Sequence, residues 1–213
     1  MANDKFSSII DKFSKQHILV IGDIILDSYI WGEVNRISPE APVLVIETTN
    51  EDMRLGGAGN VVNNLVSLGA SVSLCGVLGN DENAKLVLGL LSECKTNADG
   101  VVLDPSRPTI VKTRVIAHKQ QVVRVDKEVR TALSKNIEDK MLHAFATEIE
   151  KADAIIISDY GKGVVTEKLF SLLESLHGQG KISLLNKPVI IDPKQKNYDL
   201  YCSASVIKPN KKE

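Results

Sequence analysis

The chain has 213 residues, of which 43% are hydrophobic and 25% are charged, and these values fit a globular domain with a substantial core. Its net charge of −1 gives no electrostatic reason to expect a nucleic acid or an anionic membrane as a partner. The cysteines Cys75, Cys94 and Cys202 are too widely spaced to indicate a disulfide framework or a zinc site. No signal peptide or bilayer-length apolar run is seen, so we expect a cytoplasmic location.

Strand and helix patterns alternate along the chain. Near-continuous apolar strands such as Ile155–Ile157 and Val189–Ile191 suit a central parallel sheet that helices cover on both faces. Successive βα units therefore predict a doubly wound, mainly parallel α/β fold. We expect helices at Phe6–Phe13, Ala58–Leu68, Glu82–Cys94, Lys135–Lys151 and Thr166–His177. We expect strands of this sheet at Ile18–Gly22, Val72–Leu78, Val101–Leu103, Ala154–Ser158, Pro188–Ile191 and Ser205–Ile207.

Two regions break this rhythm and predict a small separate β-sheet. Val43–Glu47 and Thr109–Asp126 alternate apolar and polar residues, as strands do when one face is in water. The second region turns at His118–Gln120, so it is a hairpin without room for a crossover helix. A two-stranded unit is marginal alone. We therefore expect Thr109–Asp126 to pair with the Val43–Glu47 strand and with a second copy of the chain.

The first expected strand ends in carboxylates and is followed by a glycine-rich helix start. Asp23 and Asp27 follow the strand, and Gly56, Gly57 and Asn60 come about thirty residues later. Carboxylate and amide oxygens accept hydrogen bonds from vicinal hydroxyls, and glycine lets backbone N–H groups approach a ligand, so the set predicts a polyol pocket.

The same residues have alternative interpretations. Asp23 is the main candidate ligand, with a helix cap as its alternative, and Asp27 fits a turn carboxylate equally well. Asn60 could instead be a polar residue of the first helical turn. A dinucleotide fingerprint fails because the third glycine is missing, and a phosphate loop fails because no Gly-Lys-Ser/Thr follows.

Cations and carboxylates recur further along the chain. Lys112 and Arg114 share a face of the hairpin, where they could bind a phosphate or protect an edge strand from aggregation. Arg124 lies on the returning strand, and the loop Ser158–Gly163 carries Lys162, which could reach a phosphate. Two further groups follow apolar strands near the end of the chain: Asp192 with Lys194, and Asn210 with Glu213.

The order of these motifs resembles the ribokinase-like sugar kinases, the pfkB family. The stretch Arg36–Val43 and the loop Ser158–Gly163 resemble the branch that phosphorylates heptose 7-phosphate. The resemblance implies a small β lid, a homodimer formed through it, and ATP-dependent phosphorylation of the anomeric hydroxyl to heptose 1,7-bisphosphate. This step belongs to the synthesis of ADP-heptose for the lipopolysaccharide inner core.

Roles follow from the resemblance residue by residue. The sugar would be bound by Asp23, Asp27, Gly56, Gly57 and Asn60, and its phosphate by Lys112, Arg124 and Lys162. Asp192, Lys194 and Asn210 would lie on the ATP-phosphate side, and Glu213 would help to hold Mg²⁺.

Residues 1–213 match the N-terminal portion of such a domain, about its first two-thirds, with lid strands at about 41–55 and 109–126. The family's catalytic Gly-Ala-Gly-Asp is not found; the nearest string, Gly57–Asn60, ends in an amide that cannot act as a base. No catalytic residue is therefore assigned, and we expect this chain alone not to turn over at an enzymatic rate. Another phosphosugar kinase of the same fold, or a non-catalytic sugar-phosphate-binding fragment, remains an alternative.

Overall fold

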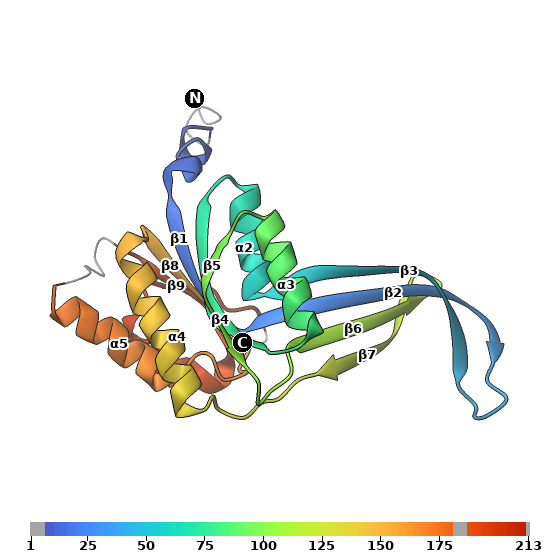
Figure 1. The fold of residues 1–213 in the computed structure, drawn as a ribbon. Helices are drawn as coiled ribbons and strands as arrows, with labels where there is room; N and C mark the ends of the chain where they lie inside the picture. The colour runs from blue at the N-terminus through green and yellow to red at the C-terminus, as the bar shows by residue number, and fades with distance from the viewer. Residues whose placement is uncertain (1–6, 181–186, 212–213) are drawn as a thin grey trace.

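The computed structural model describes residues 7–180 and 187–211, and its main body is a doubly wound α/β domain (Figure 1). Six strands form one sheet in the order β10-β9-β8-β1-β4-β5, and all of their pairings are parallel. The fold class predicted from the sequence is thus confirmed. The strands are β1 (His17–Gly22), β4 (Ser71–Gly79), β5 (Asn97–Asp104), β8 (Ala154–Ser158), β9 (Val189–Asp192) and β10 (Val206–Ile207).

Helices cover both faces of this sheet. One face packs on α2 (Ala58–Ser67) and α3 (Glu82–Glu93), and the other on α4 (Lys135–Glu148) and α5 (Glu167–Gly178). The two apolar clusters divide β1 by its alternation, since Val20 faces the first pair of helices while its neighbours Leu19 and Ile21 face the second. Three short 3₁₀ helices complete the body: η1 (Phe13–Lys15), η2 (Ile149–Lys151) and η3 (Gln195–Ser203). No helix in the described ranges is long and apolar enough to cross a membrane.

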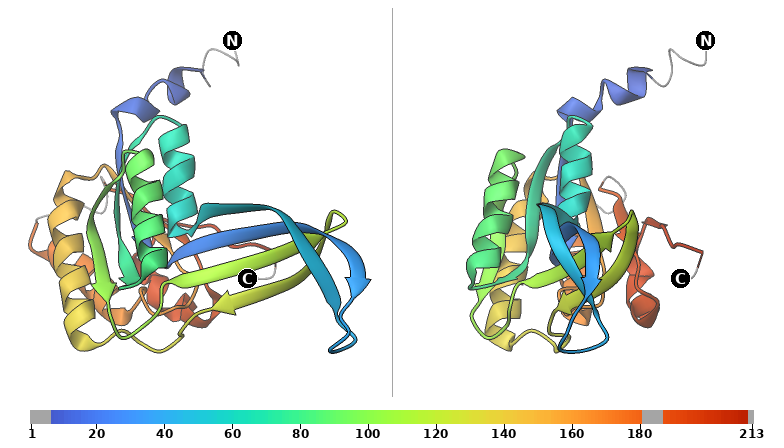
Figure 2. Two further views of the ribbon diagram at one scale, coloured as in Figure 1. Left: turned by 45° about the vertical axis from the view of Figure 1, so that its right-hand side comes forward. Right: turned by 90° about the vertical axis from the view of Figure 1, so that its right-hand side faces the viewer.

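A second sheet projects from the body (Figure 2), and we call it the lid sheet. It contains β2 (Ile24–Ile37), β3 (Leu44–Gly57), β6 (Ile110–Ala117) and β7 (Gln120–Lys127), in the order β3-β2-β6-β7. β2 pairs antiparallel with β3 and parallel with β6, and β6 pairs antiparallel with β7. The hairpin predicted at residues 109–126 is therefore outside the main sheet, as expected.

The predicted pairing within the lid sheet is wrong in one respect. The hairpin was predicted to pair directly with the strand near Val43, whereas in the structure β2 lies between β3 and β6. β2 was not predicted at all, whereas β3 lies close to the lid strand expected at about 41–55, although apolar alternation marked only Val43–Glu47. β3 exposes polar side chains on both faces over most of Glu47–Arg54, and β2 is mostly exposed from Glu33 onward, so neither strand carries apolar periodicity over its whole length.

The turn between β6 and β7 offers a test of this backbone. His118 and Lys119 form the two-residue loop with φ angles of 49° and 64°, which are left-handed values. Asn-Gly is the sequence such a turn favours, and each non-glycine residue with this backbone costs about 1–2 kcal/mol. The double substitution His118→Asn with Lys119→Gly should raise the free energy of unfolding in urea by roughly 1 kcal/mol. Gln121→Gly, within β7, should lower it; destabilisation by the turn substitution would contradict the turn geometry.

Candidate functional site

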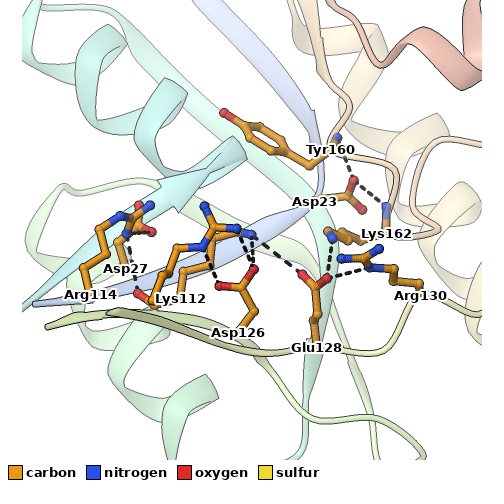
Figure 3. Close-up of polar contacts among 10 residues, drawn as sticks. Asp23, Asp27, Lys112, Arg114, Asp126, Glu128, Arg130, Tyr160 and Lys162 are labelled. Carbon is orange, nitrogen blue, oxygen red and sulfur yellow. Dashed lines mark hydrogen bonds and ion pairs between the residues drawn. The ribbon is translucent and has the colours of Figure 1, made fainter. Parts of the chain in front are cut away.

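The two sheets meet at Asp23, which lies between β1 and β2. Its backbone N–H donates to the carbonyl of Ser158, and its carbonyl accepts from the N–H of Ala58, the first residue of α2. Its carboxylate is fully buried and accepts three backbone hydrogen bonds from the loop after β8. Those donors are the N–H groups of Tyr160 (2.9 Å), Lys162 (3.0 Å) and Val164 (3.3 Å), and the first two bonds are visible in Figure 3.

This geometry gives Asp23 a structural role, and its assignment as the main sugar ligand stays a prediction. The carboxylate has no solvent-exposed surface in this structure, and both of its oxygens accept backbone hydrogen bonds. Burial raises the pKa of Asp23 to about 6, although the N–H groups of Lys162, Tyr160 and Val164 act to lower it. Asp23 thus fixes the loop that carries Lys162.

Asp27, the second carboxylate after β1, lines a pocket. Its Oδ1 accepts a hydrogen bond of 2.6 Å from Nη1 of Arg114 on β6. Burial lowers the pKa of Arg114, but the Asp27 carboxylate outweighs this and raises it above its usual value, so the ion pair is retained. Arg114 was predicted among the cations that could bind a phosphate, whereas in the structure its guanidinium pairs with Asp27.

The two glycines of the helix-start motif make room for these aspartates. A Cβ at Gly56 would lie 2.4 Å from Oδ2 of Asp27. A Cβ at Gly57 would lie 2.3 Å from the carbonyl oxygen of Asp23, and Gly57 has a φ of 55°. Gly57 pairs with Ile24, and Gly56 with the next residue of β2. The two halves of the motif are therefore packed against each other across the β2–β3 ladder.

A pocket of about 450 Å³ opens beside Asp27, between β3 and the helices α2 and α3. The guanidinium groups of Arg54 and Arg114 lie 5.2 Å and 5.3 Å from the ring centroid of Tyr29, within cation–π range. We call this hollow the polyol pocket, because oxygen and nitrogen groups that suit hydroxyls surround it. Its polar lining residues are Asp27, Tyr29, Arg54, Asn60, Asn63 and Glu93.

A second pocket of about 350 Å³ lies between the lid sheet and the loop after β8. We call it the cation pocket because six basic side chains line it: Lys112, Arg124, Arg130, Lys162, Lys194 and Lys196. Asp126 also lines it and pairs with Arg124 at 2.9 Å and with Lys112 at 3.3 Å. Burial acts to raise the pKa of Asp126, but these two cations bring it below its usual value.

The structure brings most of the sequence-predicted cations together, and it adds residues that sequence reasoning missed. Lys112, Arg124 and Lys162 meet as expected, and Lys194, which was assigned to the nucleotide side, lines the same cation pocket. Arg130, Lys196 and Glu128 were not predicted. Charged residues alternate at positions 124, 126, 128 and 130, and this period of two could have placed Glu128 and Arg130 with Arg124.

The predicted ATP and magnesium residues are less well defined. Asp192 ends β9, and its carboxylate pairs with Nζ of Lys208 at 2.9 Å. Asn210 is exposed, and Glu213 lies outside the described residues. Within residues 7–180 and 187–211, no group of three or more metal-ligating side chains is found. Magnesium bound to ATP keeps waters and phosphate oxygens as ligands, so it does not need such a group.

A doubly wound domain with a projecting sheet and adjoining polyol and cation pockets is an architecture suited to sugar phosphates. The chain belongs to the pfkB family of carbohydrate kinases, whose model matches residues 15–213.

Among curated proteins, the chain is similar to the bifunctional protein HldE of two bacteria. It is 45% identical to that of Geotalea uraniireducens (strain Rf4) over 213 residues, which are 100% of this chain and 42% of that protein. It is 47% identical to that of Sulfurimonas denitrificans over 199 residues, covering 92% of this chain and 40% of that protein. The chain thus spans about two-fifths of the length of these relatives.

Solved structures support the fold at low sequence identity. Phosphofructokinase-2 from Escherichia coli in complex with substrates and products has a TM-score of 0.70 and 19% identity, and the match covers 92% of this chain and 61% of that one. Ribokinase from Arabidopsis thaliana, complexed with ribose and ATP, has a TM-score of 0.62 and 16% identity, with the same two coverages.

Proposed function

We propose that this chain forms the sugar-phosphate-binding part of a kinase that transfers a phosphoryl group from ATP to the anomeric hydroxyl of heptose 7-phosphate. One observation carries the proposal: a single face of the lid sheet borders both pockets. Asp27 is paired with Arg54 on β3 and with Lys112 on β6, and cross-strand partners share a face. A ligand on this face meets hydroxyl-binding groups at one end and phosphate-binding cations at the other. The resemblance to heptose 7-phosphate kinases and the HldE relatives supply the identity of the sugar.

The proposed roles follow this division. Asp27 and Asn60 would bind sugar hydroxyls, with Gly56 and Gly57 shaping the wall behind them. Lys112, Arg124 and Lys162 would bind the existing phosphate through charge-assisted hydrogen bonds. Asp192, Lys194 and Asn210, with Glu213, would lie toward the phosphates of ATP and its Mg²⁺, consistent with the place of Lys194 in the cation pocket. We expect such an enzyme in the cytoplasm, where ATP is available.

The chemistry asked of these residues is positioning. In phosphoryl transfer the sugar hydroxyl attacks the γ-phosphate in line, and alignment with electrostatic stabilisation supplies most of the catalysis. When bound, ATP with Mg²⁺ supplies the phosphoryl group. The Asp27–Arg114 pair would fix the orientation of the sugar. The cation pocket would hold the substrate phosphate and offset the charge that gathers as two anionic molecules meet.

Calorimetric titration of the chain with heptose 7-phosphate, with the free heptose and with fructose 6-phosphate tests the proposal. We expect heptose 7-phosphate to bind at least tenfold more tightly than the free sugar, because the phosphate adds charge-assisted bonds of about 1.5–3 kcal/mol. Equal affinity for the two heptoses would overturn the phosphosugar assignment, and tighter binding of fructose 6-phosphate would point to another phosphosugar kinase. Phosphorus NMR after addition of ATP and Mg²⁺ then tests the expectation that this chain alone does not phosphorylate the anomeric oxygen at an enzymatic rate.

A homodimer through the lid sheet is part of the same proposal. Val123 and Val125 on β7 are 45% and 56% exposed, and their partners Val115 and Thr113 lie on the face opposite Lys112. A second copy that covers this apolar face would bury it and shield the edge strand β7.

Substitution of Val125 tests the dimer, and sedimentation velocity measures the oligomeric state. At micromolar concentrations we expect wild type to sediment as a dimer and Val125→Asp as a monomer, because a buried unpaired carboxylate opposes association. Leu86→Asp, an equally apolar exposed position on α3, is the matched control and should leave the dimer intact. A monomeric wild type would refute the interface.

A further inference from the structure

Glu128 is a buried carboxylate behind the cation pocket, and none of the roles above uses it. It follows β7 directly, and its side chain is 7% exposed. Its Oε1 accepts hydrogen bonds of 2.6 Å from Nζ of Lys162 and 2.6 Å from Nε of Arg130, and its Oε2 lies 3.7 Å from Nζ of Lys112 (Figure 3). Glu128 does not line the pocket, whereas all three of these cations do.

The three cations reach Glu128 from separate parts of the chain. Lys112 comes from β6, Arg130 from the segment after β7, and Lys162 from the loop after β8. Lys162 is held at both ends, since its N–H donates to Asp23 and its Nζ donates to Glu128. Its side chain is only 9% exposed, so two buried carboxylates determine where its ammonium group lies.

The carboxylate is kept charged by the groups it holds. Burial acts to raise the pKa of Glu128, but hydrogen bonds from Lys162 and Arg130, with the charge of Lys112 nearby, bring it below its usual value. Without a carboxylate at this point, three like charges would face each other at short range and would separate. Glu128 therefore fixes the spacing of cations whose remaining N–H groups are free to face the pocket.

We propose that Glu128 is the positioning residue that makes the site selective for a phosphorylated sugar, an inference that rests on the proposed function above. It acts through Lys112, Arg130 and Lys162, which it holds in the arrangement that a phosphate requires. Cations fixed before the ligand arrives lose less conformational freedom on binding, and this improves affinity for the phosphorylated sugar alone.

Two substitutions separate position from charge. Glu128→Asp keeps the charge but shortens the side chain by one methylene, and Glu128→Gln keeps the length but removes the charge. Positioning predicts that both lower the ratio of heptose 7-phosphate affinity to free heptose affinity by about tenfold, because the shorter Asp no longer reaches Lys162 and Arg130, and the neutral Gln holds them only by weaker hydrogen bonds without charge assistance. If Glu128 acted only as a repelling charge, Glu128→Gln would raise the ratio and Glu128→Asp would leave it unchanged, and this result would overturn the inference.

The matched control is Glu51→Gln, an exposed glutamate of β3 on the face opposite Arg54, which should not change the ratio. A double-mutant cycle separates the coupling between Glu128 and Lys162 from any general loss of folded protein. In a Lys162→Met background the effect of Glu128→Gln on the ratio should shrink at least threefold, whereas full additivity would show that the two residues do not act together. A wild-type chain without preference for the phosphorylated sugar would refute the proposed function itself, while a preference that survives both substitutions refutes only the role of Glu128.

Discussion

Replacing Asp23 by alanine should lower the free energy of unfolding by about 3–5 kcal/mol, because three buried backbone N–H groups would lose their acceptor. This is a large fraction of the 5–15 kcal/mol that stabilises a typical domain. Unfolding in urea, followed by far-ultraviolet circular dichroism, measures the loss. Asp199→Ala, at an exposed aspartate of η3, is the control and should change stability by less than about 0.5 kcal/mol.

The same residue predicts a pH dependence with a definite sign. Burial raises the pKa of folded Asp23 to about 6 from an ordinary 3.8, so the folded state binds this proton more tightly. The contribution of this bound proton to stability is complete below about pH 4 and is lost as the pH rises through 6. Asp23→Asn cannot titrate, so the stability difference between wild type and this variant should shrink by roughly 2–3 kcal/mol between pH 4 and pH 7. A difference that stays constant over this range would show that Asp23 does not titrate there.

Alanine at Gly56 should mainly lower ligand affinity, whereas alanine at the adjacent Gly57 should mainly lower stability. At Gly56 the new Cβ meets side chains, most closely the Asp27 carboxylate and then Cβ of Ile25 at 3.3 Å, so the carboxylate moves and its bond to Arg114 breaks. We expect the free energy of unfolding to fall by about 1 kcal/mol or less and heptose affinity to fall at least tenfold. Titration calorimetry on the folded variant measures the second effect.

At Gly57 the Cβ meets backbone, the carbonyl of Asp23, and the residue has a φ of 55° and a ψ of −131° that only glycine adopts readily. Here we expect a loss of about 3 kcal/mol or more in the free energy of unfolding. Gly89→Ala is the control, since nothing lies within 4 Å of its Cβ position in α3, and it should be neutral or slightly stabilising. Equal stability losses at Gly56 and Gly57 would contradict the packing described.

The elements that the sequence predicted well are those whose side chains meet a core. α2 and α3 begin at the predicted residues and end within one of the predicted ends, because helical apolar spacing is strong where one face is buried. β2 was missed because Asp27, Tyr29 and Trp31 place polar and aromatic groups on one half-buried face, and the strand is mostly exposed from Glu33 onward.

The candidate site was predictable in its residue types but not in its partners. That Lys112 and Lys162 converge on one pocket follows from the position of charges at strand ends and on one strand face. Which of the two neighbouring aspartates lines a pocket depends on a three-dimensional detail, the backbone N–H groups of a loop more than 130 residues away that bind Asp23. A pattern of carboxylates after a strand does not contain that information.

The long β2–β3 hairpin separates what must stay fixed from what is free to vary. Its base carries the close pairings of Ile24 with Gly57 and of Asp27 with Arg54, whereas its register shifts lie farther out, after Trp31 and after Val34. Residues added to or removed from the outer half would change the reach of the hairpin without moving Asp27 over Gly56. We therefore expect kinases of this family to diversify in the outer half of the hairpin, where a new partner surface or a larger sugar can be accommodated while the base of the binding site is inherited intact.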